Sequence, residues 1–239
     1  MKPFDQQVAL VTGGSKGIGY GVAEALVRLG TDVVITPRTR NEVEASAKTL
    51  SDLGPGRALG LECDVRDAAA QAEVVREATA TYGGLDIVVA NAGVGHFAPI
   101  DKLTAEQWQQ TVDVNLTGVF HTVQATLPAL KASGGFLVTI ASLAGTNFFA
   151  GGAAYNASKF GLVGFTQAVM LDVRAAGVRV STIMPGSVAT HFNGHTPQDS
   201  DAWKIQPEDI GRLVVDLVRM PARTLPSKVE VRPAQPPSA

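Results

Sequence analysis

The chain has 239 residues, of which 45% are hydrophobic and 18% are charged, and this balance excludes global disorder. Its net charge of −2 excludes the basic field that nucleic-acid binding requires and the polybasic surface that attracts anionic lipid. The single cysteine, Cys63, excludes an internal disulfide. Because it ends an apolar run with no histidine nearby in the sequence, we interpret it as a small buried apolar residue.

Short apolar segments recur along the chain and are typical of strands in a parallel sheet. Helical segments separate them, and Pro128 is expected to bend or end the longest one. The predicted strands are 8–12, 32–36, 59–63, 85–90, 136–140, 178–184 and 228–231, and the predicted helices are 20–29, 40–53, 67–82, 104–131, 153–173 and 207–219.

This regular alternation predicts an α/β fold, in which right-handed crossovers place helices on both faces of a parallel sheet. We expect one doubly wound, Rossmann-type domain with about seven strands over residues 1–239, ending in an extended proline-rich tail over 232–239. No apolar run reaches the roughly 18 residues of a membrane span, and residues 1–7 are too polar and short for a secretory leader. The expected location is the cytoplasm.

A glycine-rich turn, Thr12-Gly-Gly-Ser-Lys-Gly-Ile-Gly19, joins the first strand to the first helix. Glycines there let backbone amides approach a pyrophosphate at the positive end of the helix, which indicates a dinucleotide site. The spacing differs from the usual G-x-G-x-x-G, and a glycine-rich turn without a ligand would have the same composition.

Further polar or glycine features follow the other strands. In open parallel sheets, ligands bind beyond the carboxyl ends of the strands, near the point where the strand order reverses. A shared location at one sheet edge is therefore evidence for a site. The features at these ends are Gly13, Arg38, Asp64, Asn91, Ser142 and Pro185.

Tyr155 and Lys159, four positions apart, lie on one face of the predicted helix over 153–173. A phenol titrates near ~10, and a nearby ammonium group favours the phenolate. The pair is therefore suited to act as an acid or base on a carbonyl or alcohol oxygen. The same spacing is also common in amphipathic surface contacts.

Taken together, these motifs resemble those of the short-chain dehydrogenase/reductase family over nearly the whole chain. Each motif is modest alone, but their order and spacing are specific. The matching motifs are Thr12-Gly-Gly-Ser-Lys-Gly-Ile-Gly19, Asp64-Val65, Asn91-Ala-Gly93, Asn115, Ser142, Tyr155-x-x-x-Lys159 and Pro185-Gly-Ser-Val-Ala-Thr190.

The resemblance implies four catalytic residues. Tyr155 is expected to exchange a proton with the substrate oxygen, while Lys159 lowers its pKa and holds the nicotinamide ribose. Ser142 is expected to hydrogen-bond the same oxygen and to stabilise developing charge. Asn115 is expected to hold a water that links Lys159 to solvent, or to satisfy backbone groups at a kinked helix, or both. Chemistry also demands the proton, because a hydride that reaches or leaves a carbon requires a matched proton at its oxygen.

The resemblance also implies the residues that hold the dinucleotide, from the glycine turn through the adenine edge to the nicotinamide carboxamide. The expected cofactor contacts are Gly13, Ser15, Lys16, Gly17, Ile18, Gly19, Arg38, Thr39, Asp64, Val65, Asn91, Ala92, Gly93, Tyr155, Lys159, Pro185, Gly186, Val188 and Thr190.

NADP(H) is predicted over NAD(H). Family members that use NAD resemble one another in carrying an acidic residue after the second strand, and Pro37 occupies that position here. Arg38 can meet a 2′-phosphate with charge-assisted hydrogen bonds worth roughly 1.5–3 kcal/mol each. Lys16 is a second cation within plausible reach, although both could also be solvated surface cations.

The expected substrate is a small carbonyl or alcohol compound bound by the loops after the fourth to sixth strands. Aromatic residues there suggest an apolar or moderately sized substrate, but they could equally belong to the core or a subunit contact. The histidines do not have the spacing of a metal site, and no zinc ligand set appears. The loop residues are His96, Phe97, Thr146, Asn147, Phe148, Phe149, His191, Phe192 and His195.

The leading hypothesis is an NADP(H)-dependent oxidoreductase that interconverts a carbonyl and a secondary alcohol. One alternative is a 3-oxoacyl-carrier-protein reductase, whose basic landing patch could include Lys131, Arg174 and Arg179. The other is a non-catalytic NADP(H)-sensing module, although such relatives typically lose the Tyr or the Lys.

The resemblance further implies a homodimer or homotetramer built by pairing the two long helices that contain Asn115 and Tyr155. Apolar residues on these helices could supply the contact or could belong to the monomer core. They are Leu116, Val119, Phe120, Val123, Phe160, Val163 and Phe165.

Overall fold

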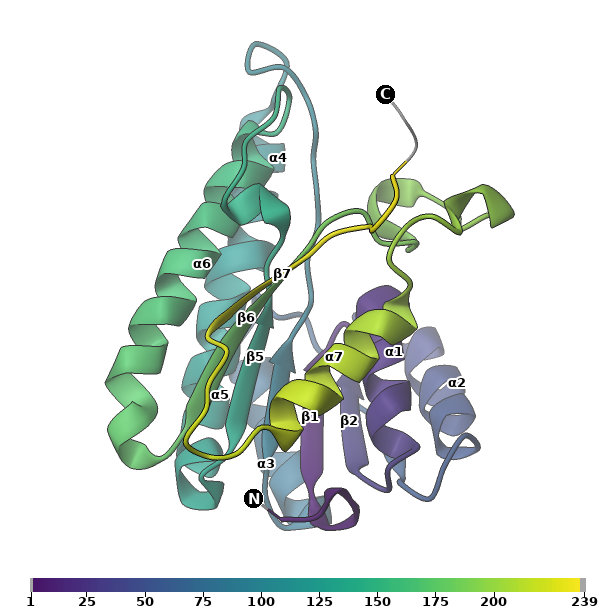
Figure 1. The fold of residues 1–239 in the computed structure, drawn as a ribbon, viewed down its shortest axis with the longest axis vertical. Helices are drawn as coiled ribbons and strands as arrows, with labels where there is room; N and C mark the ends of the chain where they lie inside the picture. Colours follow the sequence, from purple (N-terminus) through teal and green to yellow (C-terminus); the bar gives the residue numbers. More distant parts are fainter. Residues whose placement is uncertain (1, 237–239) are drawn as a thin grey trace.

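A computed structural model describes residues 2–236, without the side chains of residues 40–42. Seven parallel strands form one sheet in the order β3-β2-β1-β4-β5-β6-β7, so the strand order reverses between β1 and β4 (Figure 1). This confirms the predicted fold class. The strands are β1 (Val8–Thr12), β2 (Asp32–Thr36), β3 (Ala58–Gly60), β4 (Ile87–Ala90), β5 (Phe136–Ile140), β6 (Arg179–Pro185) and β7 (Lys228–Val231).

Helices cover both faces of the sheet, with α1, α2 and α7 on one face and α3, α5 and α6 on the other (Figure 1). Successive strand residues alternate between two cores, so that Val11 packs under the first set and Leu10 under the second. The helices are α1 (Gly17–Val27), α2 (Arg40–Ser51), α3 (Ala68–Tyr82), α4 (Ala105–Val112), α5 (Gly118–Ser133), α6 (Ala153–Val173) and α7 (Pro207–Arg219).

Besides shifts of one or two residues at element ends, the structure departs from the predicted elements at three places. The first helix begins at Gly17, inside the glycine turn, rather than at residue 20. The third strand ends at Gly60 rather than at residue 63, because β3 is an edge strand that pairs with β2 over three residues only. The helix predicted over 104–131 is interrupted by a π-helical turn, Asp113–Thr117. Pro128 lies inside α5 without ending it, because residues on either side of it, such as Leu130, are buried in the core.

Cys63 is buried, which confirms its interpretation as an apolar residue. Burial raises the pKa of its thiol to about 11, with smaller contributions from Asp64 and Asp67. A thiol that is protonated at neutral pH is a poor nucleophile. Within the part of the chain that the structure describes, no helix is long and apolar enough to cross a membrane.

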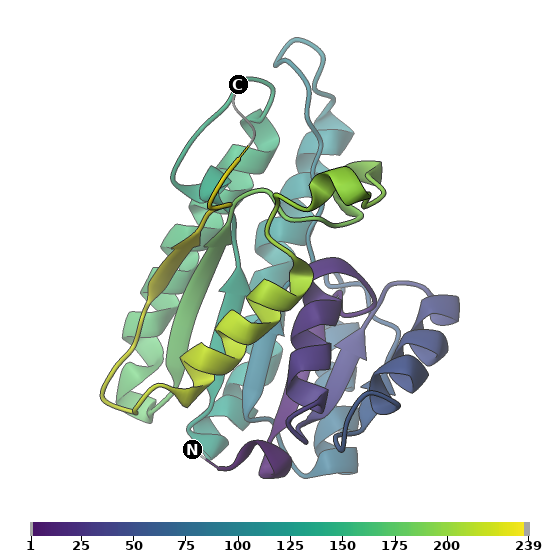
Figure 2. The same ribbon diagram turned by 45° about the vertical axis from the view of Figure 1, so that its right-hand side comes forward.

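A cap segment, residues 191–206, connects β6 to α7 and lies above α1 and α7 (Figure 2). A parallel bridge between Val188 and Ile205 closes its base. Inside it, Lys204 Nζ and His195 Nε2 each lie 2.6 Å from an Asp201 carboxylate oxygen. Hydrogen bonds from these two side chains, with Lys204 contributing more, hold the pKa of Asp201 well below its ordinary value. The cap is therefore a tethered loop rather than a frayed one.

Helix α7, which carries the cap, crosses α1 at two glycines. A Cβ on Gly211 would lie 2.3 Å from the Gly21 carbonyl oxygen, and a Cβ on Gly21 would lie 2.5 Å from the Pro207 carbonyl oxygen. The backbones therefore pack directly against each other. This close crossing fixes the position of α7 relative to the glycine turn that precedes α1.

We predict that Gly211→Ala lowers the free energy of unfolding by roughly 1–3 kcal/mol, because the added methyl group overpacks the crossing. Gly84→Ala is the matched control. A methyl group added at Gly84, between α3 and β4, would have no neighbouring atom within 4 Å, and Gly84 has no positive φ angle, so this variant should be neutral or stabilised by about 0.4–1 kcal/mol. Urea unfolding of both variants measures the difference. Equal changes in the free energy of unfolding of the two variants would contradict the close crossing of α1 and α7.

Candidate active site

The glycine turn is shaped for an anion. Gly13 and Gly17 have positive φ angles of 65° and 57°, which side-chain-bearing residues rarely adopt. Helix α1 begins at Gly17, and its N-cap residue, Lys16, makes no side-chain capping hydrogen bond. The first-turn amides and the helix dipole therefore suit the pyrophosphate of a dinucleotide. Thr190 covers this turn, since a Cβ on Gly17 would lie 3.3 Å from it.

Hydrogen bonds tie the end of β4 to the end of β1. The Thr12 hydroxyl accepts from the amides of Asn91 and Ala92 at 2.9 and 3.1 Å. The Asn91 side chain donates to the carbonyls of Thr12 and Gly13 at 2.9 and 3.2 Å. Asn91 therefore points toward β1 and holds the glycine turn at the position where the strand order reverses.

The expected adenosine end of the site carries paired charges. The Asp64 carboxylate accepts from Arg66 Nε at 3.0 Å and from Arg66 Nη2 at 2.5 Å. The side-chain hydrogen bond from Arg66 is the main cause that lowers the pKa of Asp64, and the charge of Arg38 adds to it. Arg38 and Asp64 thus share one region of the sheet edge, as the sequence predicts. The Asp64 carboxylate, expected to contact adenine, is already engaged by Arg66.

Asn115 lies in the π-helical turn and is completely buried. Its amide oxygen accepts from the Val94 N–H at 2.8 Å, and its Nδ2 donates to the Val94 carbonyl at 2.9 Å and to Ser158 Oγ at 3.0 Å. Ser158 Oγ in turn donates to the Tyr155 carbonyl at 2.8 Å. Both Asn115 amide hydrogens are used within the protein, so the side chain acts as a backbone tether. The expected water contact therefore stays a prediction.

Tyr155, Ser142 and Lys159 come together at the carboxyl edge of the sheet. Burial raises the pKa of Tyr155 above its ordinary value, and a side-chain hydrogen bond with Ser142 opposes the rise. Lys159 Nζ donates to the Ile140 carbonyl at 3.0 Å and lies 5.7 Å from the centroid of the Tyr155 ring. Burial lowers the pKa of Lys159 to about 8. The expected lowering of the Tyr155 pKa by Lys159 is therefore not seen, because desolvation dominates both groups.

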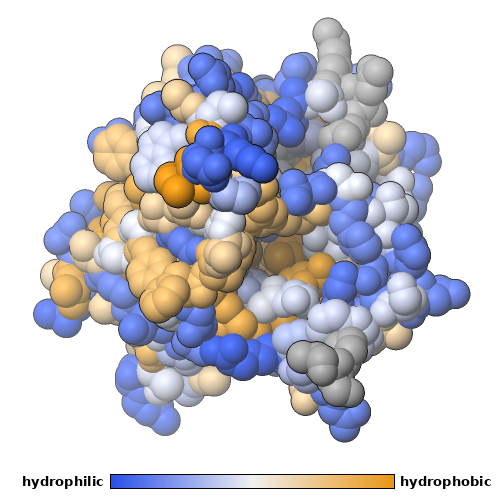
Figure 3. Space-filling model, turned by 90° about the horizontal axis from the view of Figure 1, so that it is seen from above, coloured by the Kyte–Doolittle hydropathy of each residue, from blue (hydrophilic) through white to orange (hydrophobic). Residues whose placement is uncertain are grey.

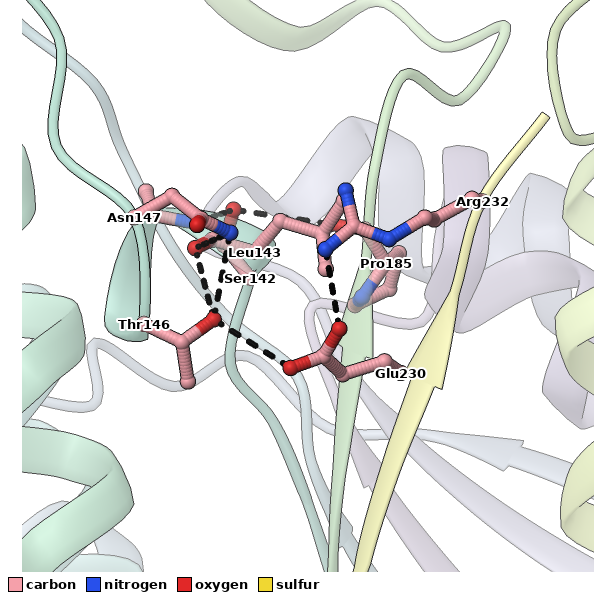
Figure 4. A network of polar contacts seen from close by, with 8 residues as sticks. Ser142, Leu143, Thr146, Asn147, Pro185, Glu230 and Arg232 are labelled. Atoms are coloured by element: carbon pink, nitrogen blue, oxygen red, sulfur yellow. Dashed lines mark hydrogen bonds and ion pairs between the residues drawn. The ribbon is translucent and has the colours of Figure 1, made fainter.

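A polar network that includes Glu230 of β7 lies beside Ser142 (Figure 4). Glu230 accepts from Thr146 Oγ1 at 3.4 Å and from Arg232 Nη2 at 2.9 Å. Ser142 Oγ lies 3.5 Å from the Pro185 carbonyl and accepts from the Ala144 amide at 3.1 Å. Glu230 on β7 and Arg232 just after it therefore bring charged side chains to this edge.

Some residues singled out in the sequence do not join the site. Three cations lie at the end of the sheet opposite Ser142 and Pro185. Lys131 is near the end of α5, before β5, whereas Arg174 precedes β6 and Arg179 is its first residue. His96 is bonded to Gln110 at 2.8 Å. His195 binds Asp201 in the cap segment. No cluster of metal-ligating side chains occurs among residues 2–236 as described.

Sequence reasoning missed several side chains that hold the site together. Asn156 is buried and donates to the carbonyls of Ala144 and Asn147, both at 2.8 Å. Ser158 and the Thr12 hydroxyl were also missed as tethers. Their position beside the Tyr155 and glycine motifs was a signal, but their roles depend on loops that are remote in sequence.

Comparisons with known proteins agree with this geometry. A family model described as short chain dehydrogenase matches residues 7–201. The 3-oxoacyl-[acyl-carrier-protein] reductase FabG of Salmonella typhimurium is 34% identical over 211 residues, which cover 88% of this chain and 85% of that protein. Glycine betaine reductase ATRR of Emericella nidulans is 33% identical over 98% of this chain, which spans only 19% of that relative's length.

Solved structures are also similar. An alcohol dehydrogenase from the archaeon Thermococcus sibiricus, complexed with 5-hydroxy-NADP, has a TM-score of 0.91 and 28% identity, with 98% of this chain and 99% of that one covered. A metagenomic short-chain oxidoreductase in complex with NADP has a TM-score of 0.85 and 34% identity, with 98% and 100% covered. Both likenesses extend over nearly the whole chain.

The buried Lys159 should leave a signature in stability against pH. Burial lowers its pKa from 10.5 to about 8, so between these values the unfolded chain binds a proton that the folded chain lacks. The free energy of unfolding should therefore rise with pH in this window, by up to about 1.4 kcal/mol per pH unit. Urea unfolding of the ligand-free protein and of Lys159→Met, at several pH values between about 8 and 10, measures the effect. If the difference in free energy of unfolding between the wild type and Lys159→Met did not change with pH, the lowered pKa of Lys159 would be contradicted.

Proposed function

This chain belongs to the short-chain dehydrogenase/reductase family, and we propose that it interconverts a carbonyl group and a secondary alcohol with NADP(H) as its redox partner. One observation carries the proposal. The Tyr155 phenol meets the Ser142 hydroxyl at the carboxyl edge of the sheet, close to the buried ammonium of Lys159. The glycine turn and the first turn of α1 supply an anion site at the same edge.

Tyr155 is the acid and base of the proposed reaction. Its raised pKa keeps the phenol protonated at neutral pH, which suits it to donate a proton to a carbonyl oxygen during reduction. Ser142 hydrogen-bonds the same oxygen and orients it toward the phenol. In the oxidation direction, Tyr155 must first lose its proton, so that direction is favoured by higher pH.

Lys159 supplies a positive charge at a fixed position close to Tyr155. Its side chain is held by the Ile140 carbonyl and by burial on all sides. When bound, the nicotinamide supplies or accepts the hydride. Asn115 keeps Val94 and α6 in register, and thereby positions the loop after β4 against Tyr155. The proton path from Tyr155 to solvent, through Lys159 and a water near Asn115, is part of this proposal.

The preference for NADP(H) rests on charge at the end of β2. Pro37 replaces the acidic residue that would repel a 2′-phosphate, and the exposed Arg38 follows it. Lys16 is also exposed, at the start of α1. Two solved structures that are similar over nearly the whole chain carry an NADP compound, which supports the same choice.

The specific alternative is reduction of 3-oxoacyl groups on an acyl-carrier protein, which the similarity to FabG favours. The three cations suggested as a landing patch do not support it, because Lys131, Arg174 and Arg179 lie at the opposite end of the sheet. A non-catalytic NADP(H)-sensing role is disfavoured, since the chain retains both Tyr155 and Lys159.

We further propose that the protein forms a homodimer or homotetramer through α5 and α6. Phe120 and Phe160 are exposed on these helices, whereas Val119 and Val123 are buried in the monomer core and are not free to form the contact. The apolar surface is thus narrower than the sequence suggests.

Tyr155→Phe should lower kcat for any carbonyl substrate by about 10²–10⁴-fold, because the variant has no proton to donate. NADPH binding, measured by fluorescence titration, should change little. Near-wild-type turnover in the variant would overturn the mechanism, whereas loss of both turnover and binding would point to misfolding.

Arg38→Ala should lower kcat/KM for NADPH by about 10–100-fold and leave the value for NADH nearly unchanged, since it removes charge-assisted hydrogen bonds to the 2′-phosphate. Arg76→Ala is the control, because Arg76 is an exposed arginine on α3 that pairs with Glu73 instead. Steady-state kinetics with both cofactors measure the ratio. A wild-type preference for NADH would contradict the role of Arg38.

A further inference from the structure

Four aromatic rings form a continuous wall at the candidate active site. Phe97, from the loop after β4, lies at its centre, with ring centroids 5.7 Å from Phe149, 5.4 Å from Tyr155 and 6.3 Å from Phe192. Tyr155 and Phe192 are themselves 5.7 Å apart. We call this group the aromatic wall. It contains the phenol that we propose as the proton donor, so a molecule bound on the wall lies beside the reacting hydroxyl.

The three phenylalanines of the aromatic wall are not buried in the hydrophobic core. Phe97, Phe149 and Phe192 are 41%, 48% and 36% exposed. Exposed apolar residues that are contiguous, rather than scattered, indicate a binding surface. Seen from above, apolar side chains gather around a hollow on this face of the molecule (Figure 3).

Two glycines make room for these rings. A Cβ on Gly95 would lie 2.6 Å from Phe192 Cζ and 2.9 Å from Phe97 Cζ. A Cβ on Gly152 would lie 2.7 Å from the Phe149 ring. Neither glycine has a positive φ angle, so space rather than backbone conformation is the physical need. The backbone is therefore built to let the three phenylalanines approach.

The segment that carries Phe192 is held in place. The cap segment is closed by the Val188–Ile205 bridge and braced by the Lys204–Asp201 ion pair and the His195–Asp201 hydrogen bond. Phe192 therefore contacts Phe97 and Tyr155 from a tethered loop. Aromatic side chains on fixed supports bind flat rings through offset or edge-to-face contacts, which a saturated chain cannot make equally well.

We propose that the substrate is a ketone, or the corresponding alcohol, in which the reacting carbon bears an aromatic ring, and that the aromatic wall binds this ring. The inference rests on the proposed function, because it assigns a substrate class to the same site. Phe97 is the main specificity-determining residue, since it contacts every other ring of the wall.

The test compares two ketones with the same number of carbon atoms, acetophenone and 2-octanone, with an acetoacetyl thioester as a third substrate. The wild type should reduce acetophenone with a kcat/KM about tenfold or more above that for 2-octanone, through contacts with two or more rings. Comparable values for 2-octanone, or a preference for the thioester, would overturn the aromatic assignment. If the protein reduced none of these three substrates and no other carbonyl compound in a screen, the proposed function itself would be overturned.

Variants locate the effect. Phe97→Ala should raise KM for acetophenone about tenfold and KM for 2-octanone much less. Phe192→Ala tests the wall from a second element. Phe148→Ala is the matched control, because Phe148 precedes Phe149 but is 86% exposed and belongs to none of these ring pairs. Melting temperatures verify that each variant is folded. Equal changes for the two ketones, or a change in oligomeric state in place of the KM effect, would overturn the role of the wall.

Discussion

The burial of Lys159 is the constraint on which the site depends. Its side chain is 4% exposed, its Nζ donates to the Ile140 carbonyl, and no ion pair between it and a carboxylate occurs within the described residues. Burying a cation without a partner charge is unfavourable, and this cost shows as the lowered pKa. The surrounding sheet and α6 must therefore be stable enough to hold it. Such an arrangement trades stability for a charge that is fixed beside Tyr155.

That arrangement would be loose if the neighbouring loops could move. Buried polar side chains prevent this by binding backbone groups of remote segments. Asn115 binds both backbone groups of Val94, and Asn156 binds two carbonyls in the loop before α6. Thr12 does the same between β1 and β4. Each tether satisfies buried polar groups and fixes a loop of the candidate site. The position of the site residues therefore depends on buried side chains that lie behind them.

Much of the fold was predictable because strands with continuous apolar runs and helices with clear end signals depend on local sequence. Pro207 at the start of α7 is one such signal, and the bounds of α6 and α7 agree with the prediction. The π-helical turn was not predictable, because it depends on how Asn115 reaches Val94, far away in sequence. The raised pKa of Tyr155 was missed for a related reason. Spacing indicates that a lysine is near, but only the folded structure shows that burial of the phenol outweighs it.

The chemistry of the proposed catalytic residues also explains why the amino-acid sequence says little about the substrate. In the proposed mechanism, Tyr155, Ser142 and Lys159 would act at a single substrate oxygen, so they would impose no shape on the rest of the molecule. Shape must come from the loops after β4, β5 and β6, where the phenylalanines lie. Gly95 is informative in this respect, because its lack of a side chain matters only if Phe97 and Phe192 must both occupy the space beside it. A methyl group at Gly95 would therefore displace Phe97 or Phe192, and with it the surface beside Tyr155 on which the proposed selectivity depends.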